Sequence, residues 1–107
     1  TAWCLERIQS KSLWERRIGV LSTFYFIRQN IFHPTTAVCA GLIHDEHDLI
    51  HKATGWMLRE LGKKSEKDLD RFLKRFASQM PRTMLRYAIE KKSAPERLRW
   101  LGCKSSG

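Results

Sequence analysis

Apolar residues between positions 49 and 61 recur three and four residues apart, which is the spacing of one face of an α-helix. The members of this stripe are Leu49, Ile50, Ala53, Trp56, Met57, Leu58 and Leu61. Gly55 interrupts the pattern, where it costs about 1 kcal/mol relative to alanine. A glycine beside a tryptophan predicts close approach by a neighbouring helix or by a ligand. The segment therefore predicts an amphipathic helix with Leu49, Ala53 and Leu61 in the core.

The rest of the chain shows the same periodicity, and no stretch has the two-residue alternation of a half-buried strand. We therefore predict an all-α protein, with helices over residues 2–9, 13–29, 35–44, 48–63, 66–77, 81–92 and 94–101. Three serines stand three residues before an acidic residue, in the spacing of a helix-opening capping box. These pairs are Ser12 and Glu15, Ser65 and Asp68, and Ser93 and Glu96.

The predicted inner helices recur at a nearly constant interval. Leu13, Leu49 and Met84 are about 36 and 35 residues apart, and Gly19 and Gly55 show the same spacing. This interval suits HEAT-like or armadillo-like helical repeats, which stack into a curved α-α superhelix whose second helices line the concave side. We expect one helical-repeat domain over residues 1–107. A plain helical bundle is the alternative that the spacing leaves open.

Basic residues outnumber acidic ones, and the excess lies in the second half of the chain. The sequence has 20 Lys and Arg against 11 Asp and Glu, a net charge of +9. Residues 1–53 are nearly balanced, so residues 54–107 carry most of the excess. Such a charge favours polyanionic partners, most simply nucleic acid, although a solubilising surface gives the same count. No run approaches the ~18 apolar residues of a membrane span, and no membrane partner is expected.

Cysteine and histidine spacings argue against disulfides and bound metals. The cysteines, Cys4, Cys39 and Cys103, are odd in number and lack CxxC spacing, which fits a reduced, cytoplasmic protein. The histidines of the cluster at 44–51 are His44, His47 and His51. They lack HExxH spacing, so we interpret them and their acidic neighbours as capping and surface residues. No phosphate-binding glycine motif is present, and no cofactor is expected.

Cationic side chains on the predicted inner helices form the candidate site. They are Arg16, Arg17, Lys52, Arg59, Arg82 and Arg86. Groups at matching positions of successive repeats line one surface, where these charges would track a phosphate backbone. The alternative is a solvated set with local ion pairs between Arg59 and Glu60 and between Arg86 and Glu90. Trp14 and Trp56 are core residues by their helix stripes, although an exposed tryptophan beside a cation stacks on a base or sugar.

Three segments carry a resemblance to a known family. They are SLWERRIGVLSTFYFIRQ at 12–29, DLIHKATGWMLRELGK at 48–63 and MPRTMLRYAIEK at 80–91. In this order and spacing the chain resembles the C-terminal part of the DNA alkylation repair enzyme family, the AlkD-like DNA glycosylases. The resemblance implies HEAT-like repeats whose basic concave surface holds duplex DNA. It also implies a hydrolase that excises N3- or N7-alkylated purines by cleaving the N-glycosidic bond, without flipping the base into a pocket.

The resemblance places two binding residues in this chain. Arg17, the second arginine of WERR, matches the DNA-contacting arginine of the family, and Trp56 of HKATGW matches the second of its tryptophans. With the other inner-helix cations, the predicted DNA-binding residues are Arg17, Trp56, Arg16, Lys52, Arg59 and Arg86.

The family's catalytic aspartate belongs to a W-x-x-x-D segment upstream of WERR. The first aspartate here is Asp45, and none of the aspartates present matches that position. We therefore expect no catalytic residue in these 107 residues and an inactive C-terminal half of a longer DNA-repair domain. An apolar face exposed at its beginning would favour a homodimer. The alternative is a stand-alone, non-catalytic HEAT-repeat module that binds DNA or a protein.

Overall fold

The computed structural model of the chain describes residues 2–102, which form helices and turns without a strand. The helices are α1 (Ala2–Arg7), α2 (Leu13–Leu21), α3 (Phe24–Arg28), α4 (His33–Gly41), α5 (Asp48–Lys64), α6 (Glu66–Phe76), the 3-10 helix η1 (Ala77–Gln79), α7 (Arg82–Ala88) and α8 (Ala94–Leu101). The prediction of an all-α protein is confirmed. No helix in this part of the chain is long and apolar enough to cross a membrane.

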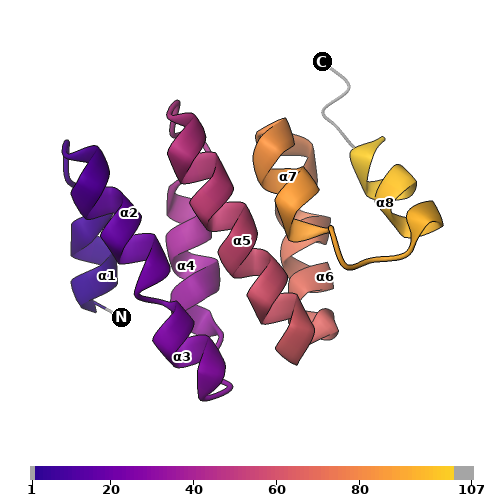
Figure 1. Ribbon diagram of the computed structural model, residues 1–107, viewed down its shortest axis with the longest axis horizontal. Helices are drawn as coiled ribbons and strands as arrows, with labels where there is room; N and C mark the ends of the chain where they lie inside the picture. The colour runs from indigo at the N-terminus through magenta and orange to yellow at the C-terminus, as the bar shows by residue number, and fades with distance from the viewer. Residues whose placement is uncertain (1, 103–107) are drawn as a thin grey trace.

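The helices lie in two layers, with α2, α5 and α7 in front and α1, α4 and α6 behind them (Figure 1). The shortest dimension is 18 Å, which corresponds to two helix diameters of about 10 Å each. Helix α5 is central and contacts α2, α4, α6 and α7. The front layer therefore presents side chains from three helices, far apart in sequence, on one face of the molecule.

The predicted helix starts are confirmed where a serine opens the helix. The Ser12, Ser65 and Ser93 hydroxyls accept hydrogen bonds from the backbone N–H groups of Glu15, Asp68 and Glu96 at 3.3, 3.3 and 3.4 Å. Helix α5 opens differently, because Nδ1 of His47 accepts from the Leu49 N–H at 3.3 Å. These local contacts fix where α2, α5, α6 and α8 begin.

The prediction of one helix over residues 13–29 is wrong, because the chain breaks between α2 and α3. Thr23 is fully buried at the break, and its hydroxyl donates to the Val20 carbonyl at 2.7 Å. A threonine that bonds a preceding carbonyl competes with the helical backbone and favours a bend. The predicted helices 2–9 and 81–92 are also shorter than expected, ending at Arg7 and Ala88.

The core is built around α5. Its fully buried side chains include Ile50, Met57, Leu58 and Leu61, and Ala53 is 4% exposed. Leu49 is 44% exposed, so its predicted core position is wrong. Trp56 follows Leu49 by seven positions, or about two helical turns, which places both on the same edge of the helix. No neighbouring helix covers that edge completely.

Trp14 was predicted to be a core residue and is 65% exposed, so this prediction is also wrong. It stands near the start of α2, whose buried residues are Gly19 and Val20 near the opposite end. Helix α2 buries only the side that meets α1, α4 and α5, and its apolar stripe is wider than that side.

Gly55 allows a neighbouring helix to approach, which was one of the two predicted explanations. A Cβ atom at this position would lie 2.6 Å from the Met84 carbonyl oxygen and 2.6 Å from the Tyr87 Cβ, both on α7. Real Cβ atoms do not make contacts this short, so only glycine lets α7 lie directly against the α5 backbone. The contact between α5 and α7 is the most extensive between any two helices of residues 2–102.

Candidate nucleic-acid interface

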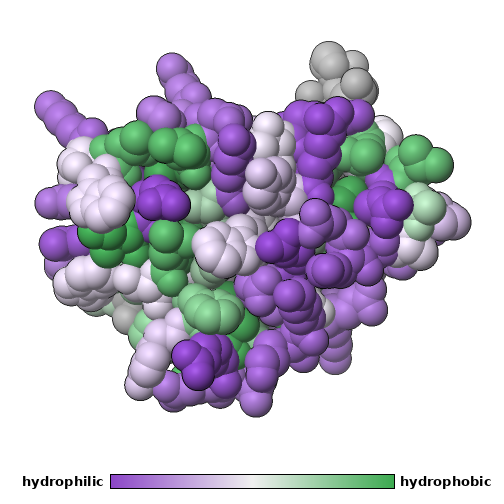
Figure 2. Space-filling model, in the orientation of Figure 1, coloured by the Kyte–Doolittle hydropathy of each residue, from purple (hydrophilic) through white to green (hydrophobic). Residues whose placement is uncertain are grey.

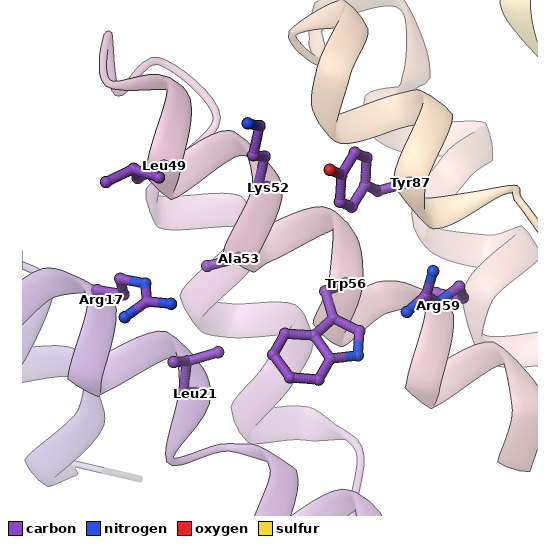
Figure 3. Close-up of a pocket in the computed structure, with 8 residues that line it drawn as sticks. All are labelled: Arg17, Leu21, Leu49, Lys52, Ala53, Trp56, Arg59 and Tyr87. Atoms are coloured by element: carbon purple, nitrogen blue, oxygen red, sulfur yellow. The ribbon is translucent and has the colours of Figure 1, made fainter.

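A shallow groove of about 190 Å³ runs across the front layer between α2, α5 and α7 (Figure 3). We call it the inner groove and define it by its lining residues. These are Arg17 and Leu21 from α2, Leu49, Lys52, Ala53, Trp56 and Arg59 from α5, and Tyr87 from α7. The groove thus joins residues that are up to 70 positions apart in the sequence.

Apolar groups form the floor of the inner groove. Leu21 and Ala53 lie at its centre, and the side chains of Leu49 and Trp56 stand at two ends of the same α5 edge (Figure 3). Trp56 is 40% exposed, so its indole is in part a surface group. An indole held on a helix and open to solvent offers the kind of surface on which a sugar or a base packs.

Cations surround this floor. In Figure 3 the Arg17 guanidinium extends from α2 toward the groove, and the Lys52 side chain stands on α5 between Leu49 and Tyr87. Within residues 2–102, no carboxylate lies at ion-pair distance from Arg17. Lys52 lies 3.4 Å from Asp48, but both side chains are well exposed, and such pairs contribute little. Arg17 and Lys52 therefore keep their charge available to a ligand.

Arg59 closes the groove at the α7 side but is already engaged. Its Nη1 donates to the Glu90 carboxylate, and its Nε lies 3.8 Å from Glu60. The Nε atom is buried and has no hydrogen-bond acceptor among residues 2–102. The alternative of local ion pairs holds for Arg59 and Glu60, whereas Glu90 pairs with Arg59 and not with Arg86.

The other predicted cations lie outside the inner groove. Arg16 turns away from its neighbour Arg17, and its Nε donates to Asp45 at 2.8 Å while Nη1 donates to the carbonyls of Ser10 and Lys11 at 3.1 Å each. Both side chains of this ion pair are largely buried. Arg16 therefore joins the turn that precedes α2 to the turn that precedes α5.

Two further arginines of the predicted set belong to α7. Arg86 is exposed and lines a separate hollow with Ile89 and Arg97, and Arg82 donates to the Leu101 carbonyl at 2.8 Å. Of the six residues predicted to bind DNA, the inner groove brings together four. They are Arg17, Lys52, Trp56 and Arg59.

Histidines and cysteines have structural surroundings. His47 caps α5, and Nε2 of His51 lies 2.5 Å from the Asp45 carbonyl. Within residues 2–102, no group of three or more His, Cys, Asp or Glu is placed to hold a metal ion. Cys4 and Cys39 are buried free thiols, and burial raises the pKa of both. Cys103 lies outside the described residues.

Sequence analysis did not single out two residues that are prominent in the structure. Tyr87 lines the inner groove, although its segment resembles an ordinary core helix. Lys92 is 3% exposed and lies 3.1 Å from Glu66, 2.5 Å from Asp70 and 3.9 Å from Glu96, a set that we call the Lys92 cluster. Only the spacing of Lys92 and Glu96, four residues apart, hinted at a local pair.

Figure 2 shows the same face coloured by hydropathy. Hydrophobic side chains gather over α2 and the adjoining part of α5, and hydrophilic side chains cover the C-terminal part of α5 and the neighbourhood of α7. The inner groove lies where these regions meet and has no Asp or Glu among its lining residues. Cations around an apolar floor that includes an indole suit a sugar–phosphate backbone, because the phosphates meet the charges and a sugar packs on the ring.

Comparison with known proteins gives one result that bears on identity. The model of a family described as DNA alkylation repair enzyme matches residues 4–91, a range that includes every residue of the inner groove. Searches of curated proteins and of solved structures give no match. Because the family match covers most of the 107 residues, this chain belongs to the DNA alkylation repair enzyme family.

Proposed function

We propose that this chain is the C-terminal portion of an alkylpurine DNA glycosylase and that its inner groove binds the backbone of duplex DNA. One observation carries the proposal. Arg17 and Trp56, which are 39 positions apart, lie in the same open groove. The Arg17 guanidinium has no ion-pair partner among residues 2–102, and the Trp56 indole is exposed. These are the two residues that the resemblance assigns to DNA contact.

The proposal includes the architecture of the domain. The two-layer order of the helices and the glycine-mediated contact between α5 and α7 support HEAT-like repeats that form a curved superhelix. In that arrangement the front layer of α2, α5 and α7 is the concave side, and residues 1–107 supply half of a DNA cradle.

Catalysis requires a group that the inner groove does not supply. Stabilising the positive charge that develops on the deoxyribose needs a nearby anion, and such electrostatic terms are usually the largest in catalysis. Asp45, the first aspartate of the chain, is held by Arg16 and by the His47 N–H outside the groove. We propose that these 107 residues bind the DNA and that they do not excise an alkylated base by themselves.

The test is binding of the purified chain to a labelled duplex across a range of salt concentrations. Arg17, Lys52 and Arg59 together are expected to neutralise two to three phosphates, which gives a slope of log K against log salt of roughly −2 to −3. The same preparation is expected to release no 7-methylguanine from alkylated DNA. A slope near zero would contradict backbone binding, and released 7-methylguanine would contradict the assignment of catalysis to groups outside this chain.

A second candidate function is a non-catalytic helical-repeat module that binds a protein or a second copy of itself. The observation in its favour is the exposure of Trp3 on α1 and Trp14 on α2, two large apolar side chains outside the inner groove. Light scattering at high concentration separates the two. A homodimer that loses duplex affinity on association favours the module, and a monomer that binds duplex favours the DNA cradle.

A further inference from the structure

Tyr87 is the one residue that α7 contributes to the inner groove. The neighbouring α7 side chains Met84, Leu85 and Ala88 are buried and anchor the helix to the core. Tyr87 is 36% exposed, and within residues 2–102 its hydroxyl has no hydrogen-bond partner. A buried ring whose hydroxyl is bonded to a neighbour would indicate a purely structural tyrosine, whereas Tyr87 is exposed and its hydroxyl has no such bond in the described part of the chain.

The direction of the side chain matters as much as its exposure. In Figure 3 the ring extends from α7 toward α5, and its hydroxyl points to the side where Lys52 stands. Trp56 lies on the same side of α5, one turn further along the helix than Lys52. Tyr87 and Trp56 therefore both line the inner groove, one from α7 and the other from α5.

Gly55 holds Tyr87 in this place. A Cβ atom at position 55 would lie 2.6 Å from the Tyr87 Cβ, so the tyrosine begins its side chain directly on the α5 backbone. Position 55 follows Lys52 by three residues and precedes Trp56 by one, which sets the tyrosine between the cation and the indole. Any larger residue at 55 would move α7 and carry Tyr87 away from both.

We propose that Tyr87 is a further DNA-contact residue and that Gly55 positions it. The ring packs against the deoxyribose next to the one on Trp56, and the hydroxyl donates a hydrogen bond to a phosphate oxygen that the Lys52 ammonium also contacts. Hydroxyl and ammonium groups on the same oxygen are ordinary backbone contacts and read no base sequence. This inference rests on the proposed function, because it assigns a role to a residue of the same groove.

The chemistry of the contact gives it a distinctive signature. A tyrosine is neutral, so its removal lowers the affinity without changing the number of counterions released. Removal of Lys52 lowers the affinity and also reduces the salt slope by about one. The two kinds of contact are therefore separable by titrating the same duplex at several salt concentrations.

The experiment measures duplex affinity by fluorescence anisotropy for Tyr87→Phe, Tyr87→Ala and Lys52→Ala. Tyr87→Phe keeps the ring and is expected to weaken binding about two- to tenfold with an unchanged salt slope, as the loss of one hydrogen bond predicts. Tyr87→Ala also loses the ring and is expected to weaken binding about tenfold or more. Tyr25→Ala is the control, because Tyr25 is more exposed than Tyr87 and lies on α3 outside the groove.

Gly55→Ala tests the positioning role. If the variant folds, as far-ultraviolet circular dichroism will show, its affinity is expected to fall to the level of Tyr87→Ala. Adding Tyr87→Ala to it is expected to change the affinity little, because the tyrosine contact is then already lost. Additive losses would contradict the positioning role of Gly55, and Tyr87→Phe tests the contact itself whether or not Gly55→Ala folds.

The outcomes for this inference and for the proposed function differ. If Arg17→Ala and Lys52→Ala weaken binding while both Tyr87 variants bind like the unmodified chain, the tyrosine contact is overturned and the DNA groove stands. If none of the groove variants differs from Tyr25→Ala, or if the chain binds no duplex, the proposed function fails and the inference fails with it.

Discussion

In the inner groove, Lys52 is half exposed and faces one solvent-exposed carboxylate, that of Asp48. In the Lys92 cluster, the ammonium is almost completely buried and contacts carboxylates from α6 and α8. Burial lowers the pKa of Lys92, but hydrogen bonds to Asp70 and Glu66 and the charges of these groups outweigh burial and raise the pKa. The two lysines count equally in a net charge of +9, yet only Lys52 has its charge available to a ligand.

Some charged side chains of this protein are available to bind DNA, and others stabilise the fold. The Lys92 cluster fastens the connection between α7 and α8 to α6. In the inner groove, Arg17 and Lys52 have no strong partners among the described residues. A substitution in the cluster should therefore change the free energy of unfolding and leave DNA binding intact. A substitution in the groove should do the opposite, and the following predictions test this division in order of decreasing effect.

Lys92→Ala is expected to lower the free energy of unfolding by about 2–3 kcal/mol. Breaking a fully buried ion pair costs about 3–5 kcal/mol, and the partial exposure of the three carboxylates reduces this cost. Urea unfolding gives the value, and Lys91→Ala is the control, since Lys91 is exposed. Equal stability of the two variants would contradict a stabilising role of the Lys92 cluster. A loss of duplex affinity in the folded Lys92→Ala protein would show that the cluster also contributes to DNA binding.

Arg16 and Arg17 test the same division between adjacent residues. Arg17→Ala is expected to weaken duplex binding about tenfold and to reduce the salt slope by about one, with little change in stability. Arg16→Ala is expected to leave duplex binding unchanged and to cost about 1–2 kcal/mol of stability, because it leaves Asp45 without its charged donor. The reverse assignment of the two effects would show that Arg16 contacts the DNA.

Glu90→Gln sharpens the comparison, because Arg59 lines the inner groove and is also held by ion pairs. Glu90 holds the Arg59 guanidinium at the end of the groove, and the neutral amide releases its charge for a phosphate. Duplex affinity is expected to rise about two- to threefold. Glu46→Gln, on an exposed residue without an ion pair in the described part of the chain, removes the same charge and serves as the control. An equal rise in both variants would assign the effect to net charge alone.

The smallest expected effect is a loss of stability at high pH. The pKa of Lys92 is raised in the folded state, so its contribution is fully present below the ordinary value of about 10.5. The contribution is lost as the pH rises through the folded pKa. The stability difference between the unmodified chain and Lys92→Ala should therefore shrink above pH 10.5. A difference that stays constant there would show that Lys92 stabilises by packing and not by charge.

Local signals in the sequence predicted much of the fold. Ser12, Ser65 and Ser93 open helices because their acceptors and donors lie within three residues, so no distant contact is needed. The break at Thr23 escaped prediction, since a helix stripe that continues through 13–29 does not show where tertiary packing bends the chain. The exposure of Leu49 was not predicted, for a related reason. Periodicity identifies an apolar face and does not say which of its edges a neighbour covers.

Residue type and the family resemblance predicted only part of the site. Arg16 and Arg17 are identical in type and adjacent, and Asp45, which separates their roles, is 29 positions away. Tyr87 joins the groove because Gly55 lets α7 lie against α5, which is a contact between residues 32 positions apart. Such pairings follow from the packing of whole helices and leave no local mark in the sequence.

The central claim is that the inner groove binds duplex DNA, and one pair of double variants tests it directly. Arg17→Ala with Trp56→Ala removes an arginine and a tryptophan from the groove. Arg28→Ala with Trp14→Ala removes the same residue types from exposed positions outside it. The groove variant is expected to bind a labelled duplex at least tenfold more weakly than the unmodified chain, while the control retains its affinity. Equal affinities of the two double variants would contradict the claim.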